Sequence, residues 1–81
     1  MSEPFIKVDL HDMRRDEALK AIEAAFKRAD SGTYQIQVIH GFNRGTALRQ
    51  FVQDEYRYDD RVKSIKPGDN PGITVLVLRE L

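Results

Sequence analysis

Histidine and aspartate stand two residues apart in Asp9-Leu10-His11, and the other histidine of the chain, His40, precedes Gly41. An imidazole titrates near neutral pH, so two of them can serve as a general acid and a general base. We therefore take Asp9, His11 and His40 as candidate catalytic residues, with Asp9 setting a tautomer.

The segment after the second histidine combines turn-forming residues with arginines. Gly41 and Gly45 allow positive φ and close backbone approach, and Asn43 tolerates a left-handed conformation. The loop leads to the start of a helix, where unpaired amides favour an anion. Arg44 and Arg49 add guanidinium groups that match phosphate geometry. These residues predict a phosphate-binding site that fits neither the P-loop nor the dinucleotide fingerprint.

The elements that must position these residues follow from the apolar spacing. Alternation predicts strands over Phe5–Leu10, Thr33–His40, Val62–Lys66 and Ile73–Leu78. Spacings of three and four predict a helix over about Arg14–Ala29 and a second that starts near Gly45 or Thr46 and buries Tyr56. The predicted order is β-α-β-α-β-β.

Right-handed crossovers make the first three strands parallel, and the short loop Pro67–Gly72 reverses the fourth. The fourth strand is apolar on both faces, which suits an interior position covered on both sides. We expect an α/β fold: a two-layer sandwich of a mixed four-stranded sheet and two helices, in a single domain over residues 3–81.

This topology brings the candidate residues to one edge of the sheet. The carboxyl ends of parallel strands lie on the same edge, so Asp9 and His11 should meet His40 there. An antiparallel fourth strand begins at that edge and adds Gly72 and Thr74 as further binding residues. Open α/β sheets bind ligands outside the carboxyl ends of their strands.

Composition limits the classes of function. The chain has 81 residues, with 13 basic residues that balance 13 acidic ones, which weakens the case for non-specific nucleic-acid binding. It has no cysteine, which favours a cytoplasmic location and excludes thiolate metal sites. The N-terminal residues lack a signal-peptide pattern, and no apolar run approaches the roughly 18 residues of a membrane span.

The motifs resemble those of the Smr (small MutS-related) domain family over Ile6 to Leu78. The matching positions are Asp9-Leu10-His11 for the first motif, His40-Gly41 and Gly45 for the second, Leu48-Arg49 for its continuation and Gly72-Ile73-Thr74 for the turn before the last strand. Asp12 stands where the first motif usually has glycine, and Asn43 where the second has its middle glycine.

The resemblance implies a fold like the C-terminal domain of translation initiation factor three. It also implies a nucleic-acid-binding domain with endonuclease activity, which would cleave RNA or nick DNA, with the ribosome as a further partner. No cofactor follows from it, although a divalent metal ion is an option. The alternative function is a non-catalytic module that binds nucleic acid or the ribosome. A protein-interaction adaptor would be signalled by an exposed apolar patch.

Several candidate residues have a structural alternative. Asp9 can cap a turn, and a histidine before a turn glycine, such as His40, can be purely structural. Arg49 can pair with Asp54 and not with phosphate. Lys66 suits a solvated strand face. The three tyrosines can stack on bases or join the core, namely Tyr34, Tyr56 and Tyr58. No metal ligands are assigned, because the spacing of the two histidines and Asp9 fits no known pattern.

Overall fold

The computed structural model describes residues 3–41 and 46–79. Its elements are β1 (Phe5–Asp9), α1 (Arg15–Arg28), β2 (Gln35–Ile39), α2 (Thr46–Tyr56), β3 (Ser64–Pro67) and β4 (Ile73–Val77). Every predicted element is present in the predicted order. Most are slightly shorter than predicted, and β3 begins later than expected.

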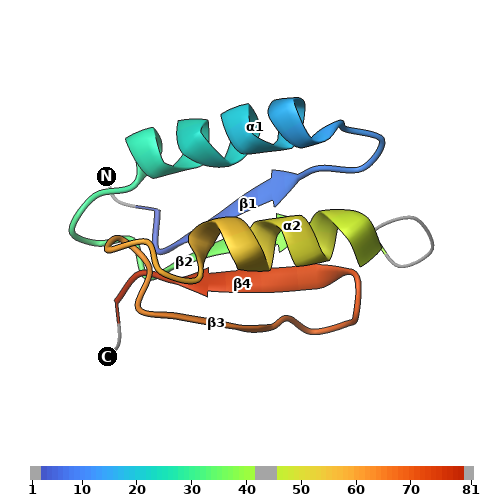
Figure 1. The fold of residues 1–81 in the computed structure, drawn as a ribbon. Coiled ribbons are helices and arrows are strands. Elements are labelled where there is room, and N and C mark those ends of the chain that lie inside the picture. The colour runs from blue at the N-terminus through green and yellow to red at the C-terminus, as the bar shows by residue number, and fades with distance from the viewer. Residues whose placement is uncertain (1–2, 42–45, 80–81) are drawn as a thin grey trace.

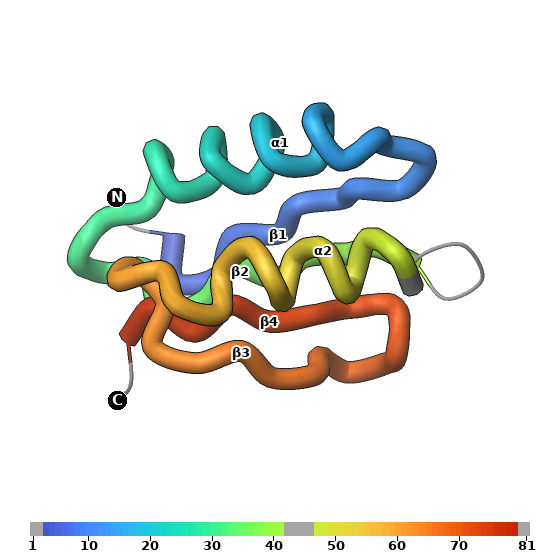
Figure 2. The backbone as a smooth tube through the Cα atoms, in the orientation of Figure 1, coloured from blue at the N-terminus to red at the C-terminus, as the bar shows by residue number. Residues whose placement is uncertain are grey.

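The sheet has the strand order β1-β2-β4-β3, and β4 therefore lies in its interior (Figures 1 and 2). β1 pairs with β2 in parallel, and β4 pairs antiparallel with both β2 and β3. β1, β2 and β3 thus share one direction, as the crossover rule predicted. The predicted fold class, a two-layer α/β domain with a mixed four-stranded sheet and two helices, is confirmed.

The core lies between the sheet and the two helices, which cover the same face (Figure 1). α1 turns Ala18, Ile22 and Ala25 inward. β4 is buried on both of its faces, but in two different ways. Leu76 packs in the core, while Val75 and Val77 face away from the helices and are only 4% and 5% exposed. Helices therefore cover only one side of this strand, and neighbouring strands shield the other.

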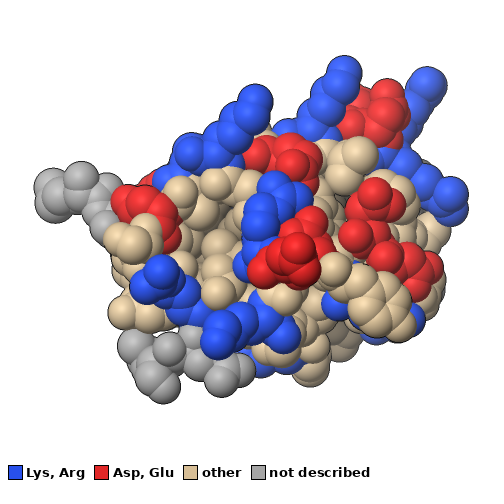
Figure 3. Space-filling view, turned by 60° about the vertical axis from the view of Figure 1, so that its left-hand side comes forward, with Lys and Arg blue, Asp and Glu red and all other residues tan. Residues whose placement is uncertain are grey.

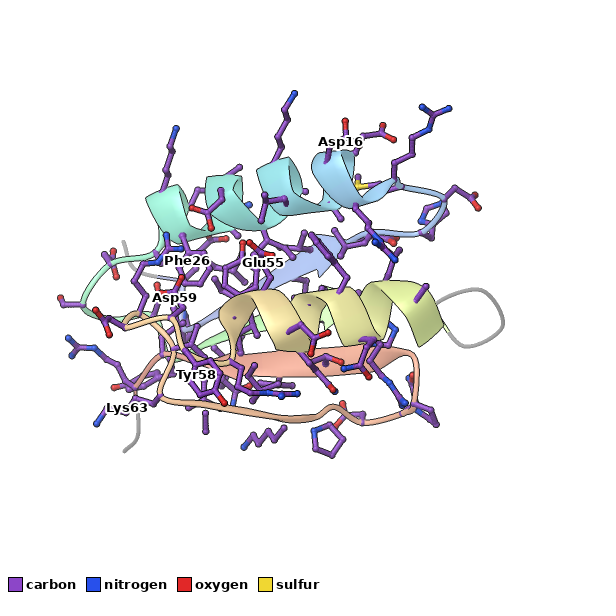
Figure 4. The ribbon with its side chains drawn as sticks, in the orientation of Figure 1. Asp16, Phe26, Glu55, Tyr58, Asp59 and Lys63 are labelled. Atoms are coloured by element: carbon purple, nitrogen blue, oxygen red, sulfur yellow. The ribbon has the colours of Figure 1, made fainter. Side chains whose placement is uncertain are left out.

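A charged cluster around Arg61 ties α1 to the segment after α2. The Arg61 guanidinium donates hydrogen bonds of 3.0 and 2.9 Å to Glu23 and of 2.9 and 2.8 Å to Asp59. Its Cζ lies 4.0 Å from the centre of the Phe26 ring. Figure 4 shows Phe26 and Asp59 close together at the end of α1. Tyr56 completes the cluster by donating a 2.7 Å hydrogen bond to Glu23.

Replacing Arg61 with alanine should lower the free energy of unfolding by about 1–2 kcal/mol. The ion pairs contribute only part of this loss, because they are partly exposed to solvent, and the cation–π contact contributes a similar free energy. The Arg61 hydrogen bonds lower the pKa of Glu23 and of Asp59. A lowered carboxyl pKa stabilises the fold above the unfolded-state pKa, and this contribution disappears as the pH falls through the folded-state pKa.

Urea unfolding of wild type and Arg61→Ala at neutral pH and below pH ~3 tests this expectation. The stability difference should shrink in acid, and Arg61→Lys should recover only part of it because lysine lacks the planar fork. An equal difference at both pH values would show that packing on Phe26 alone accounts for the effect.

Side chains of both charge signs are interspersed on the face shown in Figure 3. This distribution agrees with the balance of 13 basic and 13 acidic residues in the sequence. A surface of one sign must therefore be local. Within residues 3–41 and 46–79, no helix has the length and apolarity needed to cross a membrane.

Candidate functional site

Three chain segments meet at one edge of the sheet, which we call the rim. The amide of Leu10 donates a 2.8 Å hydrogen bond to the carbonyl oxygen of Ile39. The amides of His40 and Gly41 both donate to the carbonyl oxygen of Gly72, at 2.9 and 3.0 Å. The ends of β1 and β2 and the start of β4 therefore lie side by side, as the predicted topology requires.

Two of the predicted glycines are required by the backbone of the rim. Gly41 has a φ of +84°, a conformation that side-chain-bearing residues rarely adopt. A Cβ on Gly72 would lie 3.2 Å from the Cα of Gly41, which is tighter than most Cβ contacts, so a larger residue would push the two segments slightly apart. The predicted binding residues Asn43, Arg44 and Gly45 lie outside the described residues.

Asp9 and His11 form an exposed pair at the rim. One carboxylate oxygen of Asp9 accepts hydrogen bonds from the His11 backbone amide at 3.0 Å and from its ring Nδ1 at 2.8 Å. The side chains of His11 and Asp9 are 71% and 55% exposed. Because a carboxylate only accepts, Nδ1 carries a proton and Nε2 is the nitrogen left for a substrate.

The same contacts shift both pKa values. The side-chain hydrogen bond that His11 donates to Asp9 raises the pKa of His11, and the negative charges of Asp9 and Asp12 raise it further. The backbone hydrogen bond from His11 is the main cause of the lowered pKa of Asp9. Near neutral pH, His11 therefore holds its second proton more readily than an isolated histidine, which suits a general acid.

Asp12 holds a backbone position that favours glycine. Its φ is +60°, and among the described residues it is the only one other than glycine with a positive φ. Aspartate tolerates this conformation better than most residues, although it is still more costly than for glycine. Asp12 thus keeps the turn after His11 and adds a negative charge beside the imidazole.

His40 is buried at the same rim, with only 3% of its surface exposed. Its Nδ1 lies 3.0 Å from the carbonyl oxygen of Gly41, and its Nε2 lies 2.8 Å from the hydroxyl of Thr74. A carbonyl only accepts, so in the neutral ring Nδ1 donates and Nε2 accepts the hydroxyl proton. His40 and Thr74 thereby join the end of β2 to the start of β4.

The strand register explains why the two histidines differ. Asp9 pairs with Ile39, so the next neighbours, Leu10 and His40, point toward the helices and are buried. His11 stays with Asp9 on the open side of the sheet. The two imidazoles share a rim but point to opposite faces. The sequence held this signal, because His40 continues the buried alternation of its strand.

A groove of about 360 Å³ opens between α2 and the β3–β4 pair. Arg49, Arg57 and Lys66 line it together with Thr74, and none of the acidic side chains that the structure describes does. Asp54 lies 3.5 Å from Arg57 and accepts no hydrogen bond from Arg49. In the part of the chain that the structure describes, neither Arg49 nor Lys66 is paired with an acid. The groove is therefore a local site of positive charge.

Sequence reasoning identified Arg49 and Thr74 but missed Arg57 and Lys66 as members of this groove. Basic residues do outnumber acidic ones between Arg57 and Gly68, and this excess was the available signal. The groove lies at β4 and β3, whereas the His11 pair lies at β1. Two strand spacings, about 10 Å, separate β1 from β4.

The described residues bring together no group of three or more side chains that could ligate a metal ion. Asp9 is a carboxylate at the rim, and a magnesium ion commonly uses one or two carboxylates together with substrate phosphates. The residues present therefore fit an ion shared with the substrate better than one held by the protein alone.

Replacing Asp9 with asparagine should lower the pKa of His11, because the hydrogen bond to the Asp9 carboxylate is the main cause of the raised pKa. Asp12→Asn should lower it less, since Asp12 acts only through its charge. NMR titration of the His11 ring protons measures both shifts. An unchanged His11 pKa in Asp9→Asn would show that the pair does not form in solution.

The fold and the rim define a small two-layer α/β domain with an exposed histidine–carboxylate pair beside a basic groove. The Smr domain family model matches residues 8–79, and the chain belongs to this family. It is 37% identical over 79 residues to Endonuclease MutS2 of Symbiobacterium thermophilum, and this match covers 91% of this chain and 10% of that relative. Endonuclease MutS2 of Thermus thermophilus is 36% identical over 78 residues, and this match covers 90% of this chain and 10% of that relative.

A solved structure agrees with this assignment. The crystal structure of the Smr domain of Thermus thermophilus MutS2 matches with a TM-score of 0.80 at 32% identity. The match covers 93% of this chain and 99% of that one. The match thus spans nearly all of that solved Smr domain, while this chain spans about 10% of the length of the two curated relatives.

Proposed function

We propose that this chain is a nucleic-acid-binding Smr domain that cleaves phosphodiester bonds, with RNA favoured over DNA. The observation that carries the proposal is the exposed Asp9–His11 pair at the rim, with Nε2 of His11 directed away from its carboxylate partner. The basic groove two strands away supplies a site for the charged backbone. The named endonucleases among the relatives support the same class of activity.

In RNA, the 2′-hydroxyl oxygen attacks the adjacent phosphorus as the bond to the 5′-oxygen breaks. The departing oxygen takes the proton from Nε2 of His11, and the proton of the 2′-hydroxyl passes to water at the open rim. Asp9 keeps the ring oriented through Nδ1 and stabilises its protonated form. RNA is favoured because DNA has no 2′-hydroxyl to play the nucleophile.

Arg49 and Lys66 hold phosphates farther along the strand than the reacting one. About 10 Å separates β1 from β4 across the sheet. The groove opens on the helix side while His11 lies on the open side, so the strand passes around the rim between them. His40 acts differently from His11 in this proposal. It is a positioning residue that keeps Gly41 and Thr74 in place through its two ring nitrogens.

The test incubates end-labelled single-stranded RNA and the matching DNA with the protein, with and without EDTA, and identifies the product ends. Cleavage of RNA that leaves a cyclic phosphate and resists EDTA is the expected result. Cleavage of both substrates that EDTA abolishes would replace the 2′-hydroxyl route with a metal-activated water. No cleavage of either would remove the enzymatic proposal.

The second candidate is a non-catalytic module that binds nucleic acid or the ribosome. The burial of His40 favours it, because only one imidazole remains accessible for acid–base chemistry. In that case the wild type would bind RNA in the groove without cleaving it. His11→Ala would bind RNA with the same affinity and would also leave it intact.

A further inference from the structure

The face of the sheet opposite the helices is an open surface of unusual composition. The strand residues on this face are Phe5, Lys7 and Asp9 from β1, Gln35, Gln37 and Ile39 from β2, Ile73, Val75 and Val77 from β4, and Ser64 and Lys66 from β3. Valines form its floor, and amides, cations and an aromatic ring surround them. We call this surface the open face.

Two hollows follow the open face. The first has a volume of about 400 Å³, and Phe5, Tyr34, Val77 and Arg79 line it together with Lys66. Among residues 3–41 and 46–79, no acidic side chain lines this hollow. The second, of about 260 Å³, continues beside it with a more polar lining that includes Gln35, Gln37, Lys66 and Asp69. Gln35 and Lys66 border both hollows.

The aromatic ring of Phe5 has no evident structural reason to stand on this surface. It is 54% exposed, although phenylalanine is normally a core residue. Tyr34, on the adjoining strand end, is half-buried in the wall of the same hollow. The backbone fixes their relative position, because the amides of Tyr34 and Gln35 both donate to the carbonyl oxygen of Pro4, at 2.8 and 3.2 Å.

We propose that the open face binds single-stranded nucleic acid, with bases stacked on Phe5 and Tyr34. The proposal rests on the proposed function in that the ligand is nucleic acid, and it specifies the form of the strand and where its bases lie. Aromatic rings stack on any base, because every base has a π face. The duplex form is disfavoured, because its bases already stack on one another and are not available to a flat sheet surface.

Polar groups around the rings match the other parts of a nucleotide. Lys66 and Arg79 provide positive charge for phosphates beside the first hollow. Nε2 of Gln37 donates a 3.4 Å hydrogen bond to Oε1 of Gln35, and the remaining donor and acceptor sites of the two amides are available to base edges. Charge complementarity therefore favours a polyanion with hydrogen-bonding rings over an apolar protein partner, which would bury Lys66 and Arg79 without a counter-charge.

The open face also leads to the candidate cleavage site. Phe5, Lys7 and Asp9 point to the same side along β1, and Asp9 binds His11 at the rim. Four residues of strand span about 13 Å from Phe5 to Asp9. A single strand whose bases stack at Phe5 and Tyr34 can thus extend along β1 toward His11. This path explains why the accessible histidine lies on the open side of the sheet.

Fluorescence binding tests the proposal with a short single strand that carries one fluorescent adenine analogue, and with the same strand in a duplex. Phe5→Ala should weaken single-strand binding about tenfold and remove the quenching caused by stacking. Phe5→Leu keeps an apolar side chain but should not restore quenching. Tyr34→Ala should weaken binding similarly, and duplex binding should be unchanged in all three variants.

Tyr58→Ala is the matched control, because Tyr58 is 88% exposed and lines neither hollow. It should bind like the wild type. Thermal melting confirms that each variant is folded, and an amide NMR titration of the wild type should shift Phe5, Gln35 and Gln37. Equal affinity of wild type and Phe5→Ala for the single strand would overturn the proposal, as would wild type that binds no single strand.

The outcomes separate this proposal from the cleavage activity. Phe5-dependent binding without any cleavage would retain the open face as a binding surface and end the endonuclease proposal. Cleavage that depends on His11 but not on Phe5 or Tyr34 would retain the endonuclease proposal and end the open face as a binding surface. NMR shifts confined to α2 and the groove would place the strand on the other side of the sheet and would also overturn the proposal.

Discussion

The His11→Ala variant should cleave RNA about 10²–10⁴-fold more slowly than the wild type while it binds RNA with nearly the same affinity. The reason is that His11 is the accessible imidazole at the rim and its Nε2 is the proton donor of the proposed reaction. Single-turnover cleavage measures the rate, and filter binding on a non-cleavable strand measures the affinity. The exposure of the side chain means that the fold should tolerate the change.

His11→Gln is the matched variant, since glutamine keeps hydrogen bonding but cannot deliver a proton at neutral pH. It should be as slow as His11→Ala. A rate close to that of the wild type in either variant would show that another nuclease contaminates the preparation or that His11 has no chemical role.

The pH dependence gives a second readout of the same residue. A reaction that needs protonated His11 is fully active below its pKa and slows as the pH rises through that value. Because Asp9 raises this pKa, the decline in wild type should occur at higher pH than in Asp9→Asn. A decline at the same pH in both proteins would remove the Asp9–His11 pair from the mechanism.

Reversing the charge at Arg49 and Lys66 together should weaken RNA binding about 100-fold at low salt, because both residues line the groove and neither has an acidic partner among the described residues. Lys66 also borders both hollows of the open face, so its reversal acts on strands bound at either place. Each lost phosphate contact should also reduce the dependence of log affinity on log salt by about 0.7 for a single strand. Binding of the Arg49→Glu, Lys66→Glu variant over a range of salt concentrations measures both effects.

Lys20→Glu with Lys27→Glu is the control, because both residues are exposed on α1 and the change in net charge is the same. This pair should weaken binding only slightly. Similar losses in the two double variants would mean that net charge, and not the groove, determines affinity.

Most of the fold was predictable because its periodicities are unambiguous. Alternation located β1 and β2, and the apolar character of Ile73–Val77 on both faces predicted the interior position that β4 occupies. The chain direction of the strands then brought Asp9, His40 and Gly72 to a common rim. These features depend on local sequence and on the handedness of crossovers, which a single sequence contains.

The site was predictable only in part, because two features depend on relations between distant segments. The register of β2 on β4 brings Thr74 within hydrogen-bond distance of Nε2 of His40, whereas the burial of His40 itself follows the alternation of β2. The groove arises from the packing of α2 beside β3 and β4, which brings Arg57 and Lys66 together. The spacing of residues within one element predicts neither the register between strands nor the packing of α2 against β3 and β4.

The interior position of β4 has a consequence for how the domain is made. β2 and β3 pair through β4 and not with each other, and Gly72 and Thr74 supply the bonds that hold Gly41 and His40. Because β4 is the last strand of the domain in chain order, a nascent chain leaving the ribosome cannot complete the sheet until this strand has emerged. The rim should therefore remain incomplete on the nascent chain until β4 has left the ribosome and paired with β2.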